Sequence, residues 1–242
     1  MSEQIALVTG AATGIGAAVA TQLAGLGIKV AICDVNARDG EPLAAELGGE
    51  FVHCDVTSLS SVEAAVDTCI KKLGVPDYVH LNAGIMTVPT GDPYLAIEDV
   101  SEAQYRKIVG VNLDGVFHGM KILLPKLREK GGAVTITAST AGLSIVPVDP
   151  MYTATKYALI GFGRAVAAAN ADSNVRINVI CPGVVDTQIV PDDYKKPEFG
   201  MMPREVMANE IVDLLQRGAN GEVRVKTRAE RPAFTVEPPD LS

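Results

Sequence analysis

The sequence lacks any apolar run approaching the roughly 20 residues that a membrane span needs. Basic residues are also in deficit, because 21 Lys and Arg face 29 Asp and Glu and leave a formal net charge of −8. This charge argues against a nucleic-acid or anionic-membrane partner. The first ten residues, MSEQIALVTG, contain no basic segment followed by a long apolar one, so we expect no signal peptide.

Cysteine and histidine patterns typical of metal centres and disulfide frameworks are missing too. The four cysteines are scattered, without a CxxC pair or ligand spacing, and the three histidines are dispersed. These counts argue against a protein-only zinc site and favour reduced, mostly buried thiols. We therefore expect a cytoplasmic globular protein without a metal.

The first 34 residues have the pattern of a βαβ unit. An apolar strand at 5–8 runs into a glycine-rich turn, a helical segment follows, and a second strand covers 29–34. Glycines at the first strand-to-helix turn let backbone N–H groups approach a pyrophosphate at the helix N-terminus. The turn residues predicted to bind a dinucleotide are Gly10, Thr13, Gly14, Ile15 and Gly16.

The acid that closes the second strand bears on which dinucleotide is bound. The carboxylate of Asp34 can accept hydrogen bonds from an adenosine ribose and would repel a 2′-phosphate at the same place. Thr13 offers no cation for such a phosphate, and Arg38 is interpreted as a solvated helix charge. The sequence therefore favours NAD over NADP, with a simple turn acid as the alternative role of Asp34.

Strands and helices alternate six times up to about residue 188, without a repeat or linker. This alternation predicts one domain over 1–242, a Rossmann-like, doubly wound parallel α/β sheet of about seven strands with helices on both faces. A polar Asn112 within an apolar stretch predicts a helix distortion near 110–112. Further cofactor contacts are expected at strand ends, from Asp55, Val56, Asn82, Ala83, Gly84, Pro182 and Gly183.

The segment 139–156 carries the proposed chemistry. Tyr152 and Lys156 are four residues apart in a helix expected to begin near Met151, so they share one helix face. A nearby ammonium favours the ionised phenol, which could then act as a base near neutral pH. Ser139, at a strand end, could offer its hydroxyl to the same substrate oxygen. Taken alone, the Tyr-x-x-x-Lys spacing is better explained as two surface residues of a helix; the motifs that precede it favour the catalytic interpretation.

Over about residues 4–190 the chain resembles the short-chain dehydrogenase/reductase family. The motifs, in order, are Thr9-Gly10-x-x-x-Gly14-x-Gly16, Asp55, Asn82-Ala83-Gly84, Asn112, Ser139, Tyr152-x-x-x-Lys156, and Pro182-Gly183 followed by Thr187. The resemblance implies that Tyr152 is the acid/base, that Ser139 binds the substrate oxygen, and that Lys156 binds the nicotinamide ribose. It also implies that Asn112 holds a relay water and that Thr187, with Val185 beside it, contacts the nicotinamide end. Leu81 departs from the family pattern, which usually has Asn there.

These motifs predict an NAD-dependent oxidoreductase acting on a secondary alcohol or ketone. Residues 188–205 are expected to form a substrate lid, and 228–242 a C-terminal tail. Ser139 and Tyr152 would contact a lipophilic substrate together with the apolar residues Val146, Ile189, Met201 and Met202. The alternatives are an NADPH-dependent carbonyl reductase and a non-catalytic NAD-binding module. The family resemblance further implies a homotetramer or dimer.

Overall fold

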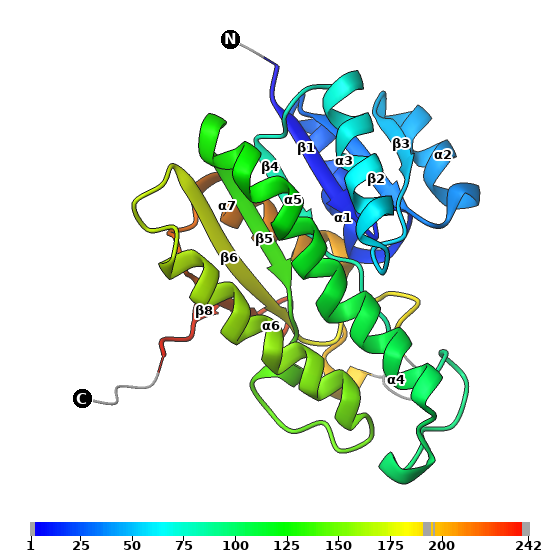
Figure 1. Cartoon of the computed structure of the whole chain (residues 1–242). Coiled ribbons are helices and arrows are strands. Elements are labelled where there is room, and N and C mark those ends of the chain that lie inside the picture. The colour runs from blue at the N-terminus through cyan, green and yellow to red at the C-terminus, as the bar shows by residue number, and fades with distance from the viewer. Residues whose placement is uncertain (1–2, 191–194, 196, 239–242) are drawn as a thin grey trace.

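The computed structural model describes residues 3–190, 195 and 197–238. Their centre is one eight-stranded sheet in the order β3-β2-β1-β4-β5-β6-β7-β8 (Figure 1). All neighbouring strands are parallel except β7 and β8, which are antiparallel. The strands are β1 Ile5–Thr9, β2 Lys29–Asp34, β3 Glu50–His53, β4 Tyr78–Leu81, β5 Gly132–Thr137, β6 Val175–Pro182, β7 Val223–Lys226 and β8 Phe234–Thr235.

Helices cover both faces of the sheet, so the prediction of a doubly wound α/β domain is confirmed. One layer contains α3, α4, α5 and α6, which lie in front of the sheet in Figure 1, and the other contains α1 and α7 behind it. The helices are α1 Gly14–Gly25, α2 Ala37–Leu47, α3 Leu59–Lys72, α4 Glu102–Val109, α5 Gly115–Lys130, α6 Pro150–Ala168 and α7 Arg204–Arg217.

The inner strands are largely buried and mostly apolar, because both of their faces are covered. Every residue of β1 is buried, as are seven of the eight residues of β6. Their side chains divide between two hydrophobic cores, one beneath each helical layer. The sequence predicted seven strands, and the structure adds β8, a two-residue strand within the expected C-terminal tail.

A π-helical turn at Gly110–Asp114 interrupts the long helical segment and separates α4 from α5. The distortion predicted near 110–112 is therefore confirmed. Asn112 is fully buried there, and its amide is satisfied outside the helix. The wider turn thus directs a polar side chain toward the end of β4.

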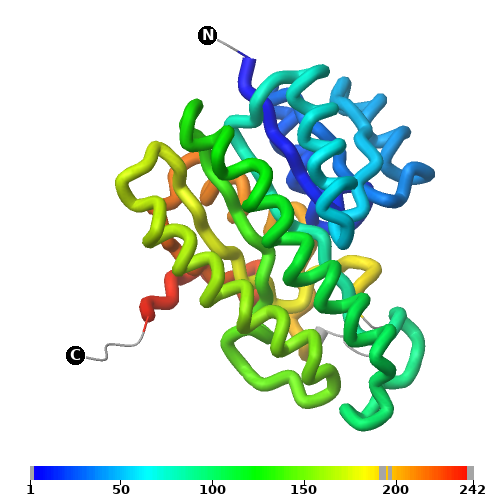
Figure 2. The backbone as a smooth tube through the Cα atoms, viewed as in Figure 1, coloured from blue at the N-terminus to red at the C-terminus, as the bar shows by residue number. Residues whose placement is uncertain are grey.

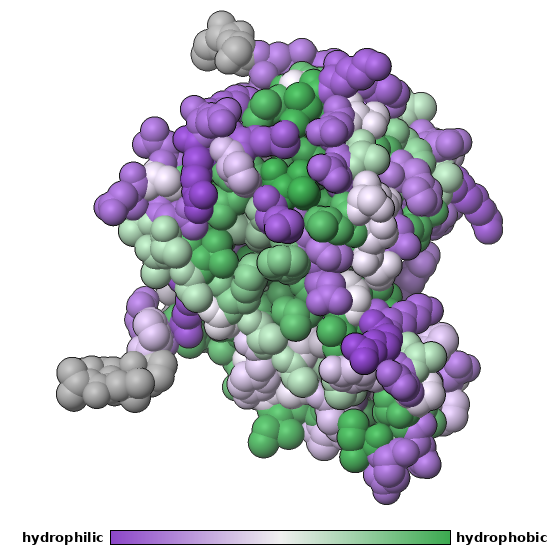
Figure 3. Space-filling model, in the orientation of Figure 1, coloured by the Kyte–Doolittle hydropathy of each residue, from purple (hydrophilic) through white to green (hydrophobic). Residues whose placement is uncertain are grey.

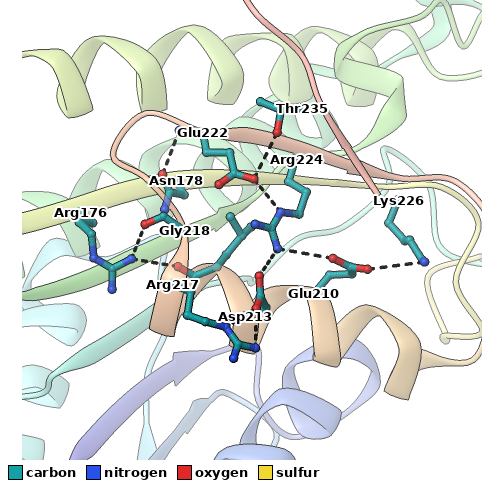
Figure 4. Close-up of polar contacts among 11 residues, drawn as sticks. Arg176, Asn178, Glu210, Asp213, Arg217, Gly218, Glu222, Arg224, Lys226 and Thr235 are labelled. Atoms are coloured by element: carbon teal, nitrogen blue, oxygen red, sulfur yellow. Dashed lines mark hydrogen bonds and ion pairs between the residues drawn. The ribbon is translucent and has the colours of Figure 1, made fainter. Parts of the chain in front are cut away.

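Helix α7 is held against β7 by a cluster of charges with Arg224 at its centre (Figure 4). The Arg224 guanidinium donates to Glu222 and Asp213, each at 2.7 Å, and lies 3.5 Å from Glu210. Lys226 lies 3.5 Å from another oxygen of Glu210. Because Arg224 is only 14% exposed, these carboxylates depend on it for compensation.

The carboxyl ends of the parallel strands meet at the lower edge of the molecule in Figure 2. The strand order reverses between β1 and β4, and this switch point opens a crevice in open α/β sheets. The loops over 84–101 and 143–149 extend beyond the sheet at this edge (Figure 2). In the described part of the chain, no helix is long and apolar enough to cross a membrane.

Candidate active site

A crevice of about 640 Å³ lies at the switch point, within the size range of small-molecule and cofactor sites. Most of the residues that the sequence predicted as cofactor contacts line it. They are Gly10, Thr13, Gly14, Ile15, Asp34, Asp55, Val56, Asn82, Ala83, Gly84, Tyr152, Lys156, Pro182, Gly183, Val185 and Thr187. The topology thus brings motifs from the whole chain into one site.

The glycine turn has the shape expected of a phosphate-binding loop. Gly10 and Gly14 have φ of +63° and +59°, which side-chain-bearing residues rarely adopt. A Cβ on Gly10 would lie 2.8 Å from the Cα of Ala83. Gly16 is not in the crevice lining, and a Cβ there would lie 2.2 Å from the carbonyl oxygen of Gly10. We therefore assign Gly16 to the packing of α1 against the turn.

Asp34 and Asp55 both combine a crevice position with a structural task. Asp34 accepts from the backbone N–H of Ala12 at 2.9 Å and of Asn36 at 3.0 Å, so it also fixes the glycine turn. Asp55 accepts from the N–H and the hydroxyl of Thr57 at 3.0 and 2.7 Å. Each carboxylate can still accept a hydrogen bond from a ligand, because it has about four lone-pair sites.

Asn82 ties the end of β4 to the glycine turn. Its amide nitrogen donates to the carbonyls of Thr9 and Gly10, each at 3.2 Å. Its amide oxygen accepts from the hydroxyl of Thr137 at 3.2 Å. The buried His80 ring lies behind this group, with Nε2 3.4 Å from the same hydroxyl and Nδ1 2.7 Å from Thr135. His80 is thus a packed core histidine.

Ser139, Tyr152 and Lys156 converge on one wall of the crevice. Ser139 follows β5, and Tyr152 lies in the first turn of α6; both line the crevice. One turn later, Lys156 Nζ lies 5.4 Å from the centre of the Tyr152 ring and donates to the Thr137 carbonyl at 2.9 Å. Gly84 leaves room for this ammonium, since a Cβ there would lie 3.3 Å from Nζ.

Burial dominates the acid–base properties of these groups in the chain alone. It raises the pKa of Tyr152 to about 12, although the polar Ser139 side chain acts to lower it. Burial also lowers the pKa of Lys156 to about 8. The expectation that the ammonium by itself lowers the phenol pKa is therefore wrong for the chain alone: desolvation outweighs it.

Asn112 lies behind the crevice rather than in its lining. Its amide oxygen accepts from the N–H of Ile85 at 2.8 Å, and its nitrogen donates to the carbonyl of Ile85 at 3.0 Å and to Thr155 at 3.1 Å. These bonds fix Ile85, which does line the crevice. The role of Asn112 in holding a relay water stays a prediction.

The structure separates the predicted substrate residues. Ile189 lines the crevice beside Ser139 and Tyr152, but Val146, Met201 and Met202 do not. Met202 is instead fully buried, bridged to Val185 in the core around α1 and α7, and Met201 faces a groove beside α1 and α2. The expected lid over 188–205 and tail over 228–242 include residues 191–194, 196 and 239–242, which lie outside the described residues.

Three contributors to the site were missed by the sequence analysis. Thr137 anchors Lys156, Lys107 lines the crevice from α4, and Asp149 caps the helix that carries Tyr152. Only Asp149 has a recognisable signal, because Asp followed by Pro150 is typical of a helix N-terminus. The other two reach the site through tertiary packing.

The fold and the site define a nucleotide-binding α/β oxidoreductase, and comparison with known proteins specifies its class. The model of the short chain dehydrogenase family matches residues 4–198. The chain belongs to the short-chain dehydrogenase family. It is 34% identical over 233 residues to 3-alpha-(or 20-beta)-hydroxysteroid dehydrogenase of Mycobacterium tuberculosis, covering 94% of this chain and 86% of that protein. It is 35% identical over 213 residues to (+)-borneol dehydrogenase 1 of Salvia officinalis, covering 83% and 78%.

Solved structures are similar over nearly the whole chain. The 3-ketoacyl-(acyl-carrier-protein) reductase of Brucella melitensis, crystallised with NADH, has a TM-score of 0.86 at 26% identity and covers 94% of this chain and 98% of that one. Levodione reductase has a TM-score of 0.85 at 27% identity, with coverage of 94% and 97%. Both likenesses support the assigned fold and family.

Proposed function

We propose that this chain transfers hydride between the CH–OH carbon of a lipophilic secondary alcohol and NAD, with Tyr152 as the acid/base. The observation that carries the proposal is the convergence of Ser139, Tyr152 and Lys156 in the lining of one crevice. A surface role for the Tyr-x-x-x-Lys pair is disfavoured, because Lys156 is almost fully buried and anchored to Thr137.

The residues present fit a nicotinamide dinucleotide. The turn at Gly10 and Gly14, which a side chain would obstruct, can receive the pyrophosphate at the start of α1, and Asp34 can accept from the adenosine ribose. When bound, the cofactor accepts or supplies the hydride and, when oxidised, brings a positive ring charge to the site. The preference for NAD over NADP rests on the carboxylate of Asp34.

The chain's own residues divide the remaining work. Ser139 would hold the substrate oxygen, and the Tyr152 phenolate would take its proton as the C–H bond breaks. Lys156 would stabilise that phenolate from its fixed position above Thr137. General-base assistance of this kind is worth about 10²–10⁴ in rate. Because burial disfavours the phenolate in the chain alone, the charge that accompanies oxidised cofactor is part of what makes Tyr152 usable near neutral pH.

A lipophilic substrate is supported by the lining of the crevice near Tyr152. Ile85, Val111, Ile189 and Val190 contribute apolar side chains there, and Lys107 contributes a cation. The related hydroxysteroid and borneol dehydrogenases are named for alcohols of this apolar kind. We therefore place the substrate among cyclic or bulky secondary alcohols. Cytoplasmic location and self-association belong to the same proposal.

An assay of purified protein with NAD and a panel of cyclic secondary alcohols, read as absorbance of reduced nicotinamide at 340 nm, tests the function. We expect turnover on at least one alcohol, and Tyr152→Phe should bind NAD normally and lose at least about 10²-fold in kcat. Wild-type turnover by Tyr152→Phe would refute the assignment. Normal NADH binding without turnover on any alcohol or ketone would instead favour a binding module, and faster turnover with NADPH would favour the carbonyl reductase alternative.

A further inference from the structure

A buried carboxylate lies at the start of the helix that carries Tyr152. Asp149 is only 2% exposed and is the N-cap of α6. Its Oδ1 accepts from the Tyr152 N–H at 2.9 Å and from the Thr87 hydroxyl at 2.6 Å. Its Oδ2 accepts from the Thr87 N–H at 2.9 Å. An N-cap needs only the first of these bonds, so Asp149 does more than cap the helix.

The two bonds to Thr87 join α6 to the opposite wall of the crevice. Thr87 lies in the loop after β4, two residues from Ile85, which lines the crevice. Three residues further on, the Thr90 hydroxyl donates to the carbonyl of Gln188, another lining residue, at 2.7 Å. Asp149 is therefore the point at which this loop is fastened to the first turn of α6. A shift of Thr87 would move the crevice wall relative to the phenol.

The hydrogen-bond pattern also defines the charge of this group. All three bonds are donated to Asp149 by N–H or O–H groups, which is the arrangement that stabilises an ionised carboxylate. A buried negative charge disfavours the phenolate, and Asp149 indeed adds to burial in raising the pKa of Tyr152. Asp149 is buried and Tyr152 is partly buried, so water screens this interaction less than it would between two exposed groups.

Other charged or polar groups around Tyr152 act differently. Lys156 on the same helix is a cation, Lys107 on α4 is an exposed cation elsewhere in the crevice lining, and the Ser139 side chain from the end of β5 acts to lower the phenol pKa. On β6, Cys181 is a thiol whose own pKa burial raises to about 12, so it is neutral. Asp149 is the anionic group found to act on Tyr152 within the described residues.

We propose that Asp149 is a positioning residue that fastens the crevice wall, through Thr87, to the helix that carries Tyr152. The proposal rests on the function proposed above. The hydroxyl of Thr87 serves only this fastening, whereas the charge of Asp149 also opposes ionisation of the phenol.

The test compares pH profiles of kcat and KM for Asp149→Asn and Thr87→Val, with NAD and the alcohol turned over fastest in the panel. Asn keeps the acceptor for Tyr152 N–H and the Thr87 hydroxyl and removes the charge, but it also loses the bond from Thr87 N–H, because its amide nitrogen cannot accept it. We expect its acid limb of kcat to move to lower pH by about one unit. Thr87→Val should leave that limb in place and raise KM about fivefold, because it removes a single hydrogen bond. Asp172→Asn, which removes an exposed charge, is the matched control and should change neither.

If Asp149→Asn folds and the acid limb of its kcat profile stays at the wild-type pH, the electrostatic role is overturned. If KM is unchanged in Thr87→Val, the fastening role is overturned. If Asp149→Asn does not fold, Asp149→Ser carries the same test, since Ser is also a good N-cap and has no charge. Tyr152→Phe, measured alongside, distinguishes the two proposals. If it is inactive while the limb of Asp149→Asn stays fixed, only the inference about Asp149 fails; if it turns over normally, the proposed function fails.

Discussion

The ammonium of Lys156 lies 5.4 Å from the centre of the Tyr152 ring and is held there by the carbonyl of Thr137. Burial lowers the pKa of this ammonium to about 8, while it raises the pKa of the phenol to about 12. Free Lys and Tyr have nearly equal pKa values of 10.5 and 10.0, so burial drives the two groups apart and makes the ammonium the stronger acid of the pair. The ionisation of Tyr152 therefore depends on bound ligands and on neighbouring groups as much as on Lys156.

Removal of the ammonium should affect catalysis more than folding. Lys156→Met keeps the length of the side chain and removes the charge that stabilises the Tyr152 phenolate. We expect kcat/KM to fall by at least about 10²-fold, the scale of lost acid–base assistance. Lys121→Met, on the exposed surface of α5, is the control and should retain wild-type activity. Loss of less than tenfold in Lys156→Met would contradict the assigned role.

Because His80 is buried in its neutral form, we expect it to contribute to the loss of stability of the protein at acid pH. Burial lowers the pKa of His80 from its ordinary value of 6.5 to about 3. A histidine whose pKa is lower in the folded than in the unfolded state contributes stability that is complete above pH 6.5. This contribution is lost as the pH falls toward 3. Between pH 6.5 and about 3, His80 is protonated only in the unfolded chain. Each unit of decrease in pH within this range should therefore lower the free energy of unfolding by about 1.4 kcal/mol.

Urea unfolding of the wild type and of His80→Gln at several pH values between 7 and 4 measures the contribution of His80 to stability. Gln can accept from Thr135 and donate to Thr137, but it does not titrate. The stability difference between the two proteins should shrink or reverse in favour of Gln as the pH falls. Parallel curves would show that His80 does not carry the predicted titration.

The charge cluster of Figure 4 offers a contrast between a buried and an exposed arginine. Arg224→Ala leaves the carboxylates of Glu222 and Asp213 without their central cation, and we expect a loss of about 3–5 kcal/mol in unfolding free energy. Arg217 also contacts Asp213 but is 75% exposed, so Arg217→Ala should cost about 0–1 kcal/mol. Denaturant titration of both variants tests the ranking, and equal losses would contradict it.

Asp34 should control cofactor choice. Asp34→Ala removes the acceptor expected for the ribose hydroxyls and the acceptor for Ala12 N–H. NAD binding should therefore weaken, and the preference of the enzyme for NAD over NADP should fall at least about tenfold. The ratio of kcat/KM values for NAD and NADP measures this change. Asp39→Ala is the control, because Asp39 lies in α2 and does not line the crevice. A wild-type ratio in Asp34→Ala would show that the carboxylate serves only the turn.

Self-association is expected through the helical layer seen in Figure 3. Phe117 on α5 and Tyr157 on α6 are 48% and 46% exposed, so both aromatic side chains are available to pack against a second copy of the chain. Apolar surface is visible among the polar residues on this face of the molecule in Figure 3. Phe117→Lys should shift the sedimentation coefficient toward the monomer at micromolar concentration. Lys121→Gln, on the same helix, should leave it unchanged. A monomeric wild type would contradict the expectation.

Sequence reasoning located the site well where chemistry and local pattern coincide. The glycine turn, Asp34, Asn82, Ser139 and Tyr152 all follow strand ends or begin helices, and a parallel sheet necessarily collects such positions at one edge. The interruption of the helix at Asn112 was also predictable, because a buried amide needs partners outside the helix.

The substrate side was not predictable in the same way. Met202 belongs to the same apolar segment as its neighbours, and only the bridge to Val185 decides that it packs into the core. The fastening of Thr87 to Asp149 joins residues 62 positions apart, and no local pattern indicates it. Sequence periodicity reports which face of an element is buried, but it does not report which loop covers that face.

The four buried thiols have a practical consequence. Each has a raised pKa and none forms a disulfide, so each is a poor nucleophile at neutral pH. A fluorophore or spin label attached through maleimide chemistry should therefore pass over all of them in the folded protein. A cysteine introduced at an exposed site such as Ile145 could be labelled selectively against the native background, which would let spectroscopy follow the rim of the crevice during turnover.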